Sequence, residues 1–230
     1  LFEKEYCVIS ELMNAPERPC VFVLGGAKVA DAFLMMETVL QNNIADYILT
    51  GGLVANILLA ATGEKIGQGS LAFIRDSNYG EYIEKAKTIY SKYSEKILLP
   101  QDLAYVEHQK REETNLQSVP EKITAVDIGE NTVLLYRKYI LEAKTVFVNG
   151  PMGVFEEPLT EFGTKEIWEA LGKTKAFTVI GGGDSITATA KYGKTQEISY
   201  ICTGGGALIR FLTGEELPVV KALRNNAIQK

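Results

Sequence analysis

Histidine and cysteine are scarce in this 230-residue chain, and basic residues are not in excess. The single histidine, His108, excludes a His-rich zinc site, and three widely spaced cysteines without a CxxC pair are typical of a reduced cytosol. The 24 Lys and Arg residues against 29 Asp and Glu residues give a formal net charge of -5. Non-specific nucleic-acid binding needs a basic surface, so we expect no nucleic-acid partner, and any bound phosphate must be held by local donors.

Long apolar runs are also missing. No uninterrupted apolar stretch reaches the roughly eighteen residues that a membrane span needs, and the N-terminus is acidic where a signal peptide would be basic and then apolar. We therefore expect a cytoplasmic protein without a membrane partner. The 46% hydrophobic content is enough for a genuine core, which excludes intrinsic disorder. Because the chain begins at Leu1 within a predicted helix, we expect it to be a piece of a longer protein.

Strand-like apolar runs alternate with helix-like stretches through most of the chain, which indicates parallel strands joined by crossover helices. The candidate strands are Val21 to Leu24, Asp46 to Thr50, Lys96 to Leu99, Ile123 to Asp127, Thr145 to Val148, Phe177 to Ile180 and Ser199 to Cys202. The first, fifth and sixth are apolar at nearly every position, as expected for strands covered by helices on both faces. We therefore predict an α/β domain, a Rossmann-like three-layer fold with a parallel sheet between helices.

Apolar residues at helical spacing predict the crossover helices. One stripe consists of Val29, Phe33, Met36 and Leu40, and further amphipathic stretches run from Tyr79 to Tyr93, Thr132 to Ala143 and Thr164 to Leu171. The polar stretch from Leu103 to Val119 predicts a short strand with an excursion that carries His108 on the surface. A leading helix over residues 1–14 should end at Ala15–Pro16, because a residue before proline disfavours the helical conformation.

Glycines are concentrated directly after the predicted strands. Twelve of the 21 fall in five clusters: Gly25-Gly26, Gly51-Gly52, Gly150 with Gly153, Gly181-Gly182-Gly183 and Gly204-Gly205-Gly206. Ligands of open parallel sheets lie outside the carboxyl ends of the strands, where glycine lets the backbone approach and helix N-termini face anions. This placement predicts a phosphate-rich ligand, while any one cluster could equally serve only its strand-to-helix turn.

The common nucleotide motifs do not fit these loops. LGGAKVAD, GGGDSI and GGGALI do not complete the G-x-G-x-x-G pattern, so a dinucleotide site has weak support. The two GKT triplets, at Gly172 and Gly193, lack the glycine that a Walker A loop has five positions earlier. The phosphate-binding loops must therefore have a different design.

Four of the loops are recognisable by their sequences, order and spacing: VLGGAKVAD (Val23 to Asp31), VNGPMGVFE (Val148 to Glu156), VIGGGDSITA (Val179 to Ala188) and CTGGGA (Cys202 to Ala207). Together they resemble the nucleotide-binding, C-terminal half of phosphoglycerate kinase, and GGLVAN (Gly51 to Asn56) resembles the archaeal branch of that family. The resemblance implies that residues 1–14 form the helix between two domains and that residues 15–230 form the nucleotide-binding domain. It also implies that the N-terminal substrate domain is absent from this chain.

The resemblance implies a role for each residue of these loops, and each has a plainer alternative. Lys28 contacts the nucleotide phosphates, or is a solvated lysine. Asp184 holds the Mg²⁺ of the nucleotide, or caps its helix. Ser185 offers a hydroxyl and an amide to the terminal phosphates. Asn149 lies near the β- and γ-phosphates, or is a turn residue.

The remaining implied residues complete the site. Glu156 accepts hydrogen bonds from the ribose hydroxyls, or is an ordinary surface acid. Gly26, Gly51, Gly52, Ile128 and Val154 line the adenine slot. Pro151 also contacts the nucleotide, and the catalytic set consists of Lys28, Gly182, Gly183 and Gly205. The sequence departs from the family at Ala32, where many relatives carry a second lysine that helps neutralise the transferring phosphoryl group.

The implied reaction is the reversible transfer of a phosphoryl group between 1,3-bisphosphoglycerate and MgADP, which gives 3-phosphoglycerate and MgATP. This chain would carry only the nucleotide half, so we expect it to bind ATP and ADP without turnover. Two alternatives remain open from the sequence: a nucleotide-binding module without catalysis, and an NAD-dependent dehydrogenase domain. The failure of the G-x-G-x-x-G pattern counts against the dehydrogenase.

Overall fold

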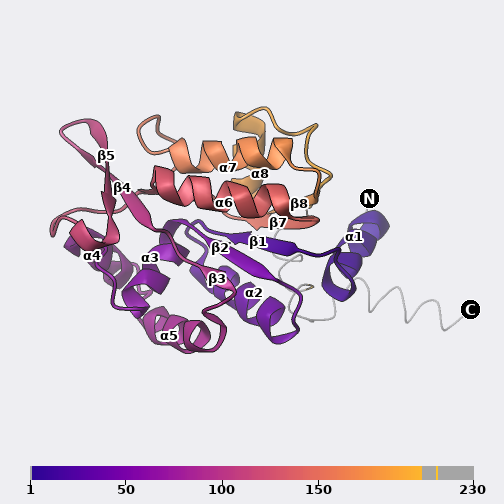
Figure 1. Cartoon of the computed structure of the whole chain (residues 1–230), viewed down its shortest axis with the longest axis horizontal. Helices are drawn as coiled ribbons and strands as arrows, with labels where there is room; N and C mark the ends of the chain where they lie inside the picture. The colour runs from indigo at the N-terminus through magenta and orange to yellow at the C-terminus, as the bar shows by residue number, and fades with distance from the viewer. Residues whose placement is uncertain (1, 204–210, 212–230) are drawn as a thin grey trace, which may run out of the picture.

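The fold is a six-stranded parallel sheet between two layers of helices, seen in a computed structural model that describes residues 2–203 and 211 (Figure 1). The strands are β1 (Cys20–Leu24), β2 (Tyr47–Thr50), β3 (Ile97–Leu98), β7 (Thr145–Asn149), β8 (Phe177–Gly181) and β9 (Tyr200–Ile201). Each lies within a residue or two of a predicted strand. The order across the sheet is β3-β2-β1-β7-β8-β9, and every pair is parallel. The predicted α/β class is confirmed.

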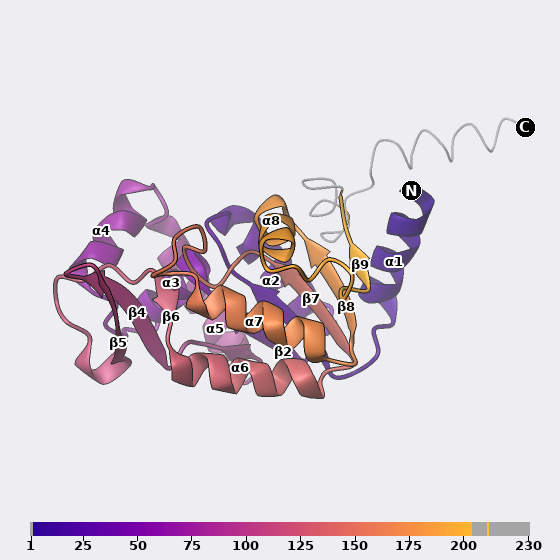
Figure 2. The ribbon, with the colours of Figure 1, turned by 90° about the horizontal axis from the view of Figure 1, so that it is seen from above.

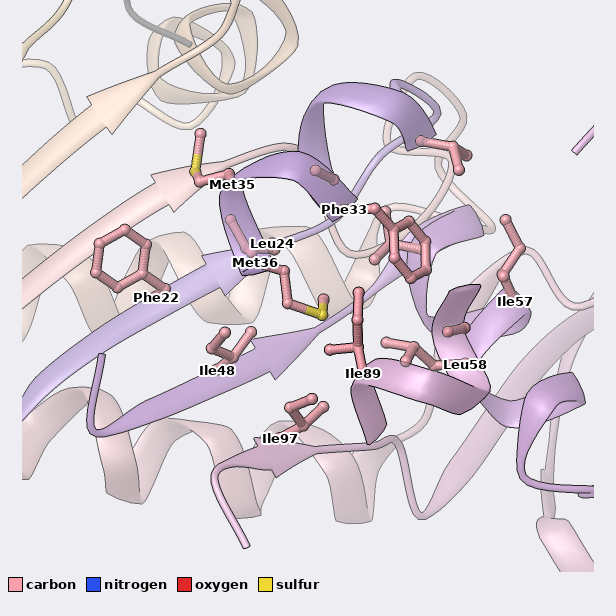
Figure 3. Packing of buried hydrophobic residues seen from close by; sticks show 14 of the residues in the cluster. Phe22, Leu24, Phe33, Met35, Met36, Ile48, Ile57, Leu58, Ile89 and Ile97 are labelled. Atoms are coloured by element: carbon pink, nitrogen blue, oxygen red, sulfur yellow. The ribbon is translucent and has the colours of Figure 1, made fainter. Parts of the chain in front are cut away.

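Helices cover both faces of this sheet (Figures 1 and 2). One layer holds α1 (Phe2–Asn14), α2 (Val29–Gln41), α3 (Gly52–Ala61), α4 (Gln68–Asp76) and α5 (Glu81–Tyr93), and the other holds α6 (Glu130–Glu142), α7 (Phe162–Lys173) and α8 (Gly183–Lys191). Successive side chains of β1 face opposite layers: Phe22 packs with the first, as Figure 3 shows, and Val21 and Val23 pack with the second. Burial on both sides explains why this strand is a continuous apolar run.

Neither α3 nor α4 was predicted by periodicity. The sequence of α3, GLVANILLAA, is apolar at nearly every position, so it has no polar stripe that would reveal a helical period. Its buried residues are Leu53, Val54, Ala55, Ile57, Leu58 and Leu59. The helix contacts α2, α4 and α5, and this surrounding by other helices accounts for its composition. None of the helices in the described part of the chain is both long and apolar enough to cross a membrane.

A second, antiparallel sheet replaces one of the predicted parallel strands. It contains β4 (Asp102–Glu107), β5 (Lys110–Asn115) and β6 (Asp127–Ile128), in the order β5-β4-β6. The prediction of a strand over Ile123 to Asp127 was wrong for most of that range: its first part runs beside α4, where the amide of Gly69 donates to the Ile123 carbonyl. The polar excursion is the β4–β5 hairpin, and His108 is exposed in its turn with a φ of 49°.

Candidate functional site

The order in which the chain connects the strands reverses between β1 and β7. The chain leaving β1 goes on to β2 on one side, and the chain leaving β7 goes on to β8 on the other, so their loops diverge and open a crevice. Leu24 and Asn149 are paired across these strands, and the amide of Gly26 donates to the carbonyl of Pro151 at 2.8 Å. Two of the glycine loops predicted from the sequence, those after β1 and β7, therefore meet at the switch point of the sheet, where open parallel sheets bind ligands.

A small, open cradle lies at this switch point. It is lined by Gly25, Gly26, Ala27, Lys28, Asn149, Gly150, Gly182, Gly183, Asp184 and Ser185. Two helices begin here: Lys28 is the N-cap of α2, Gly182 is the N-cap of α8, and neither makes a side-chain capping hydrogen bond. Free amides and the dipoles of two helix N-termini make the cradle favourable for an anion.

Gly182 is at a position that a larger residue could not occupy. Its φ is +86°, and a Cβ atom here would overlap the side-chain oxygen of Asn149, which is itself buried at the end of β7. The glycine therefore allows Asn149 to lie directly beneath the start of α8. The two residues that the sequence analysis placed near the phosphates are thus packed against each other.

Asp184 and Ser185 have different surroundings in the first turn of α8. Asp184 is exposed and does not cap the helix, because Gly182 holds that position, so the capping alternative was wrong. Ser185 is fully buried, and its Oγ accepts a hydrogen bond from the amide of Gly150 at 2.7 Å. The hydroxyl expected to face phosphates therefore attaches the loop after β7 to α8.

A larger cavity of about 370 Å³ adjoins the cradle. Of the predicted nucleotide-binding residues it is lined by Gly26, Gly52, Ile128, Pro151, Val154, Glu156 and Asp184. Asp184 and Gly26 line both hollows and join them. Gly52, with a φ of +55°, approaches Gly26 so closely that a Cβ atom would lie 2.7 Å from the Gly26 nitrogen. Gly51 is different: it packs against Met152 and does not line the cavity.

Several walls of this cavity were missed by the sequence analysis. Phe73 of α4 lines it with half of its side chain exposed, and Asn56 of α3 and Thr124 add polar atoms. No local signal marks Phe73, because α4 itself was not predicted. GGLVAN, which contains Asn56, was noted only for its resemblance to the archaeal branch, and the segment around Thr124 carries no motif, so only the tertiary packing reveals that they line the cavity.

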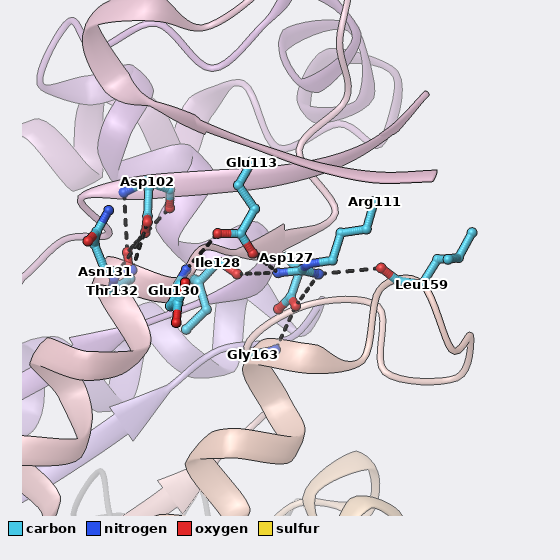
Figure 4. A network of polar contacts seen from close by, with 10 residues as sticks. All are labelled: Asp102, Arg111, Glu113, Asp127, Ile128, Glu130, Asn131, Thr132, Leu159 and Gly163. Atoms are coloured by element: carbon cyan, nitrogen blue, oxygen red, sulfur yellow. Dashed lines mark hydrogen bonds and ion pairs between the residues drawn. The ribbon is translucent and has the colours of Figure 1, made fainter. Parts of the chain in front are cut away.

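Asp127, at the start of β6, lines the same cavity and is held by a polar network (Figure 4). Its Oδ2 accepts hydrogen bonds from Arg111 at 2.9 Å and from the amide of Gly163 at 2.7 Å. Arg111 also donates to the carbonyls of Ile128 and Leu159. Burial raises the pKa of Asp127 to about 6, against the opposing effect of Arg111, and its Oδ1 has no hydrogen-bond partner. The sequence analysis assigned no role to Asp127 or Arg111.

Two further predicted positions bear on the site. Gly205 lies outside the described residues, whereas Thr203, just before it, donates from its amide and its hydroxyl to a carboxylate oxygen of Glu5 in α1. Ala32 is fully buried in α2. The position for which the resemblance implies a lysine therefore faces the core in this chain.

The comparisons with known proteins agree with this geometry. The phosphoglycerate kinase family matches residues 1–215. Phosphoglycerate kinases from Methanothermus fervidus and Methanococcus maripaludis are 42% and 43% identical, each over 97% of this chain and 54% of the relative. The crystal structure of phosphoglycerate kinase from Pyrococcus horikoshii matches at 38% identity with a TM-score of 0.90, over 97% of this chain and 56% of that one. The chain spans about half the length of these relatives, and it belongs to the phosphoglycerate kinase family.

Proposed function

We propose that this chain is the nucleotide-binding half of a phosphoglycerate kinase, which binds MgATP and MgADP at the switch point of its sheet. The observation that carries this proposal is the pair of joined hollows: a mostly apolar cavity of about 370 Å³ beside a cradle formed by two helix N-termini. A flat base fits an apolar slot with a few polar groups, and phosphates fit the N-termini. Asp184 lines both hollows, so it lies where the base end of a bound nucleotide would join its phosphates.

The residues predicted from the sequence have separate roles in this proposal. The walls of the base slot are formed by Gly26, Gly52, Ile128, Pro151 and Val154. Gly51 packs against Met152 next to this slot. Glu156 accepts hydrogen bonds from the ribose hydroxyls. The phosphates are surrounded by Lys28, Asn149, Gly182, Gly183, Asp184 and Ser185. The catalytic set consists of Lys28, Gly182, Gly183 and Gly205.

The metal of the nucleotide fits the donor set of the cradle. Within residues 2–203 and 211, no group of three or more His, Cys, Asp or Glu side chains forms a ready metal site. An exposed single carboxylate, Asp184, suits Mg²⁺, which keeps several waters and takes its other ligands from phosphate oxygens. When bound, Mg²⁺ supplies charge compensation on those oxygens.

The chain's own residues act mainly by positioning and electrostatics. Phosphoryl transfer needs in-line alignment and compensation of charge on the equatorial oxygens, with little covalent chemistry from the protein. The Lys28 ammonium, at the first turn of α2, would contribute a positive charge beside the phosphates. The amides at the starts of α2 and α8 would hold them in place. The whole reaction, between 1,3-bisphosphoglycerate and ADP, requires the other half of the enzyme, to which α1 would be the connecting helix.

The proposal is tested by titrating the purified chain with MgADP, metal-free ADP and NAD. We expect MgADP to bind and NAD to bind far more weakly, because the loops lack the dinucleotide pattern. Asp184→Ala should weaken MgADP binding much more than binding of metal-free ADP, since its partner is the ion. Glu156→Gln is the matched control: it should weaken both equally, because the ribose is the same with and without metal. An Asp184→Ala variant without any metal-dependent difference would refute the assignment.

A further inference from the structure

The loop after β7, residues 150–161, is bonded to α8 at both ends of that helix. Near the start of the loop, the amide of Gly150 donates to Ser185 Oγ at 2.7 Å. Further along, Lys191 Nζ donates to the carbonyl of Phe155 at 2.6 Å and lies 3.4 Å from the carbonyl of Glu156. Ser185 is in the first turn of α8 and Lys191 is its last residue, so the loop runs beside the whole helix. The two attachments hold loop and helix as one unit.

Each of the three N–H groups of the Lys191 ammonium has an acceptor nearby. Besides the two carbonyls, its ammonium forms an ion pair with Glu161 at 2.7 Å, at the end of the same loop. The contact with Lys191 lowers the pKa of Glu161. Hydrogen bonds from a charged donor are stronger than those between neutral groups, and these two side chains are partly exposed, 34% for Lys191 and 22% for Glu161. Lys191 therefore links Phe155 and Glu156, in the middle of the loop, to Glu161 at its end.

This loop supplies one wall of the larger cavity. Pro151, Val154 and Glu156 all line it, whereas Lys191 lines neither the cavity nor the cradle. The backbone of Glu156 determines where its carboxylate can reach, and that backbone is the one next to Lys191. An effect of Lys191 on a bound ligand must therefore pass through Glu156 and its neighbours.

We propose that Lys191 is a positioning residue for the nucleotide, which fixes the backbone of Phe155 and Glu156 to α8 and so holds the Glu156 carboxylate against the ribose hydroxyls. This inference rests on the proposed function, because it requires a nucleotide in the cavity. It adds a link between the two ends of the ligand: α8 presents its N-terminus to the phosphates, and its C-terminal residue holds the ribose-facing loop.

The test compares MgADP with the magnesium complex of 2′,3′-dideoxy-ADP, which lacks both ribose hydroxyls. In the parent chain, the dideoxy nucleotide should bind more weakly, because Glu156 then loses its donors. Lys191→Met should weaken MgADP binding about tenfold and dideoxy-ADP binding less than about twofold, since the lost interaction involves the hydroxyls. The matched control is Lys194→Met. Lys194 forms ion pairs with Glu169 and Glu197 just beyond the same helix but does not contact the loop, so both affinities should stay at parent values.

A double-mutant cycle distinguishes an effect of Lys191 through Glu156 from a general loss of structure. If Lys191 acts through Glu156, Lys191→Met should change MgADP affinity very little in a chain that already carries Glu156→Gln. Equal weakening of both nucleotides by Lys191→Met, an unchanged MgADP affinity, or additive effects in the cycle would each overturn the inference. A parent chain that binds neither nucleotide would instead overturn the proposed function, and this inference with it.

Discussion

At the scale of single residues, burial controls the chemistry of Asp127. Its side chain is completely shielded from solvent, and the single ion pair with Arg111 does not compensate for the loss of water, so its pKa is raised to about 6 from an ordinary value of 3.8. The Arg111 guanidinium also lies 4.9 Å from the centre of the Phe162 ring. This network joins the β4–β5 hairpin to β6 and to the start of α7 beside the cavity. It therefore helps to hold this wall of the cavity in place.

The raised pKa of Asp127 predicts a pH dependence of folding stability. A group whose pKa is higher in the folded state than in the unfolded state favours folding most fully below about pH 4, and this contribution is lost as the pH rises through about 6. The difference in free energy of unfolding between the parent and Asp127→Asn, which cannot titrate, should therefore fall by about 2 kcal/mol between pH 4 and pH 7. Urea unfolding of both proteins across this range measures it. A difference that stays constant or rises with pH would contradict the prediction.

Lys28 should contribute directly to nucleotide binding. It is exposed at the start of α2 and lines the cradle, where its ammonium can reach phosphate oxygens. Lys28→Ala should reduce the free energy of MgATP binding by about 1.5 to 3 kcal/mol, the range for a charge-assisted contact. Calorimetric titration checks this, with Lys65→Ala as a control on an exposed lysine that lines neither hollow. Unchanged binding in Lys28→Ala would mean that amides and metal hold the phosphates without it.

Restoring the family lysine at position 32 should not help this chain. Ala32 is fully buried in the core cluster with Phe33 and Met36, so a lysine there would have to displace packed side chains or bury its ammonium. Ala32→Lys should therefore lower the stability by at least about 2 kcal/mol and leave MgATP affinity no higher than that of the parent. Thermal unfolding together with titration tests both parts. A stable variant with tighter binding would show that the side chain reaches the cradle.

At the scale of secondary-structure elements, a segment could be predicted from the sequence when its burial left a regular apolar pattern. β1, β7 and β8 lie between two helical layers, so their apolar runs were sufficient to predict them. β5 is exposed or half-buried at every position and leaves no apolar pattern. β6 is only two residues long, so its pairing with β4 depends on contacts that sequence spacing does not contain.

The same reasoning separates the predicted from the missed parts of the site. Glycines after strands marked the loops of the cradle, because an open parallel sheet brings the ends of its strands to one edge. The wall formed by Phe73 could not be predicted in this way, since α4 is placed at the cavity by its packing against α3 and its hydrogen bonds with residues 121–125. Contacts within the loops, such as that of Ser185 with Gly150, also depend on the relative placement of two elements.

At the scale of the whole molecule, the first helix and the last described strand lie side by side (Figure 2). Ile9 and Leu12 of α1 are almost fully buried in the same core cluster as Cys202, which follows β9. Glu5 of the same helix accepts hydrogen bonds from Thr203. The helix proposed to connect the two halves of the enzyme is therefore packed against the domain proposed to bind the nucleotide, next to the residues that follow the last described strand.

The distribution of cations among the described residues favours the expectation that this chain alone does not complete the reaction. A phosphoglycerate substrate needs cationic groups that face it across the transferring phosphate. Among the described residues, every arginine is paired with a carboxylate and none lines the cradle: Arg18 with Asp46, Arg75 with Asp76, Arg111 with Asp127 and Glu113, and Arg137 with Glu166. Lys28 is the one cationic side chain of that part of the chain that lines the cradle, and it is assigned to the nucleotide.

We therefore expect the purified chain to bind MgADP but to form no ATP from 1,3-bisphosphoglycerate above the uncatalysed rate. Binding should survive because both hollows are built entirely from residues of this chain, whereas transfer needs a second substrate held in line with the nucleotide. A coupled assay of ATP formation at saturating MgADP measures the turnover, and calorimetry on the same sample verifies that the nucleotide site is filled. Turnover close to that of a full-length relative, assayed in parallel, would contradict the prediction, because it would require a phosphoglycerate site within these residues.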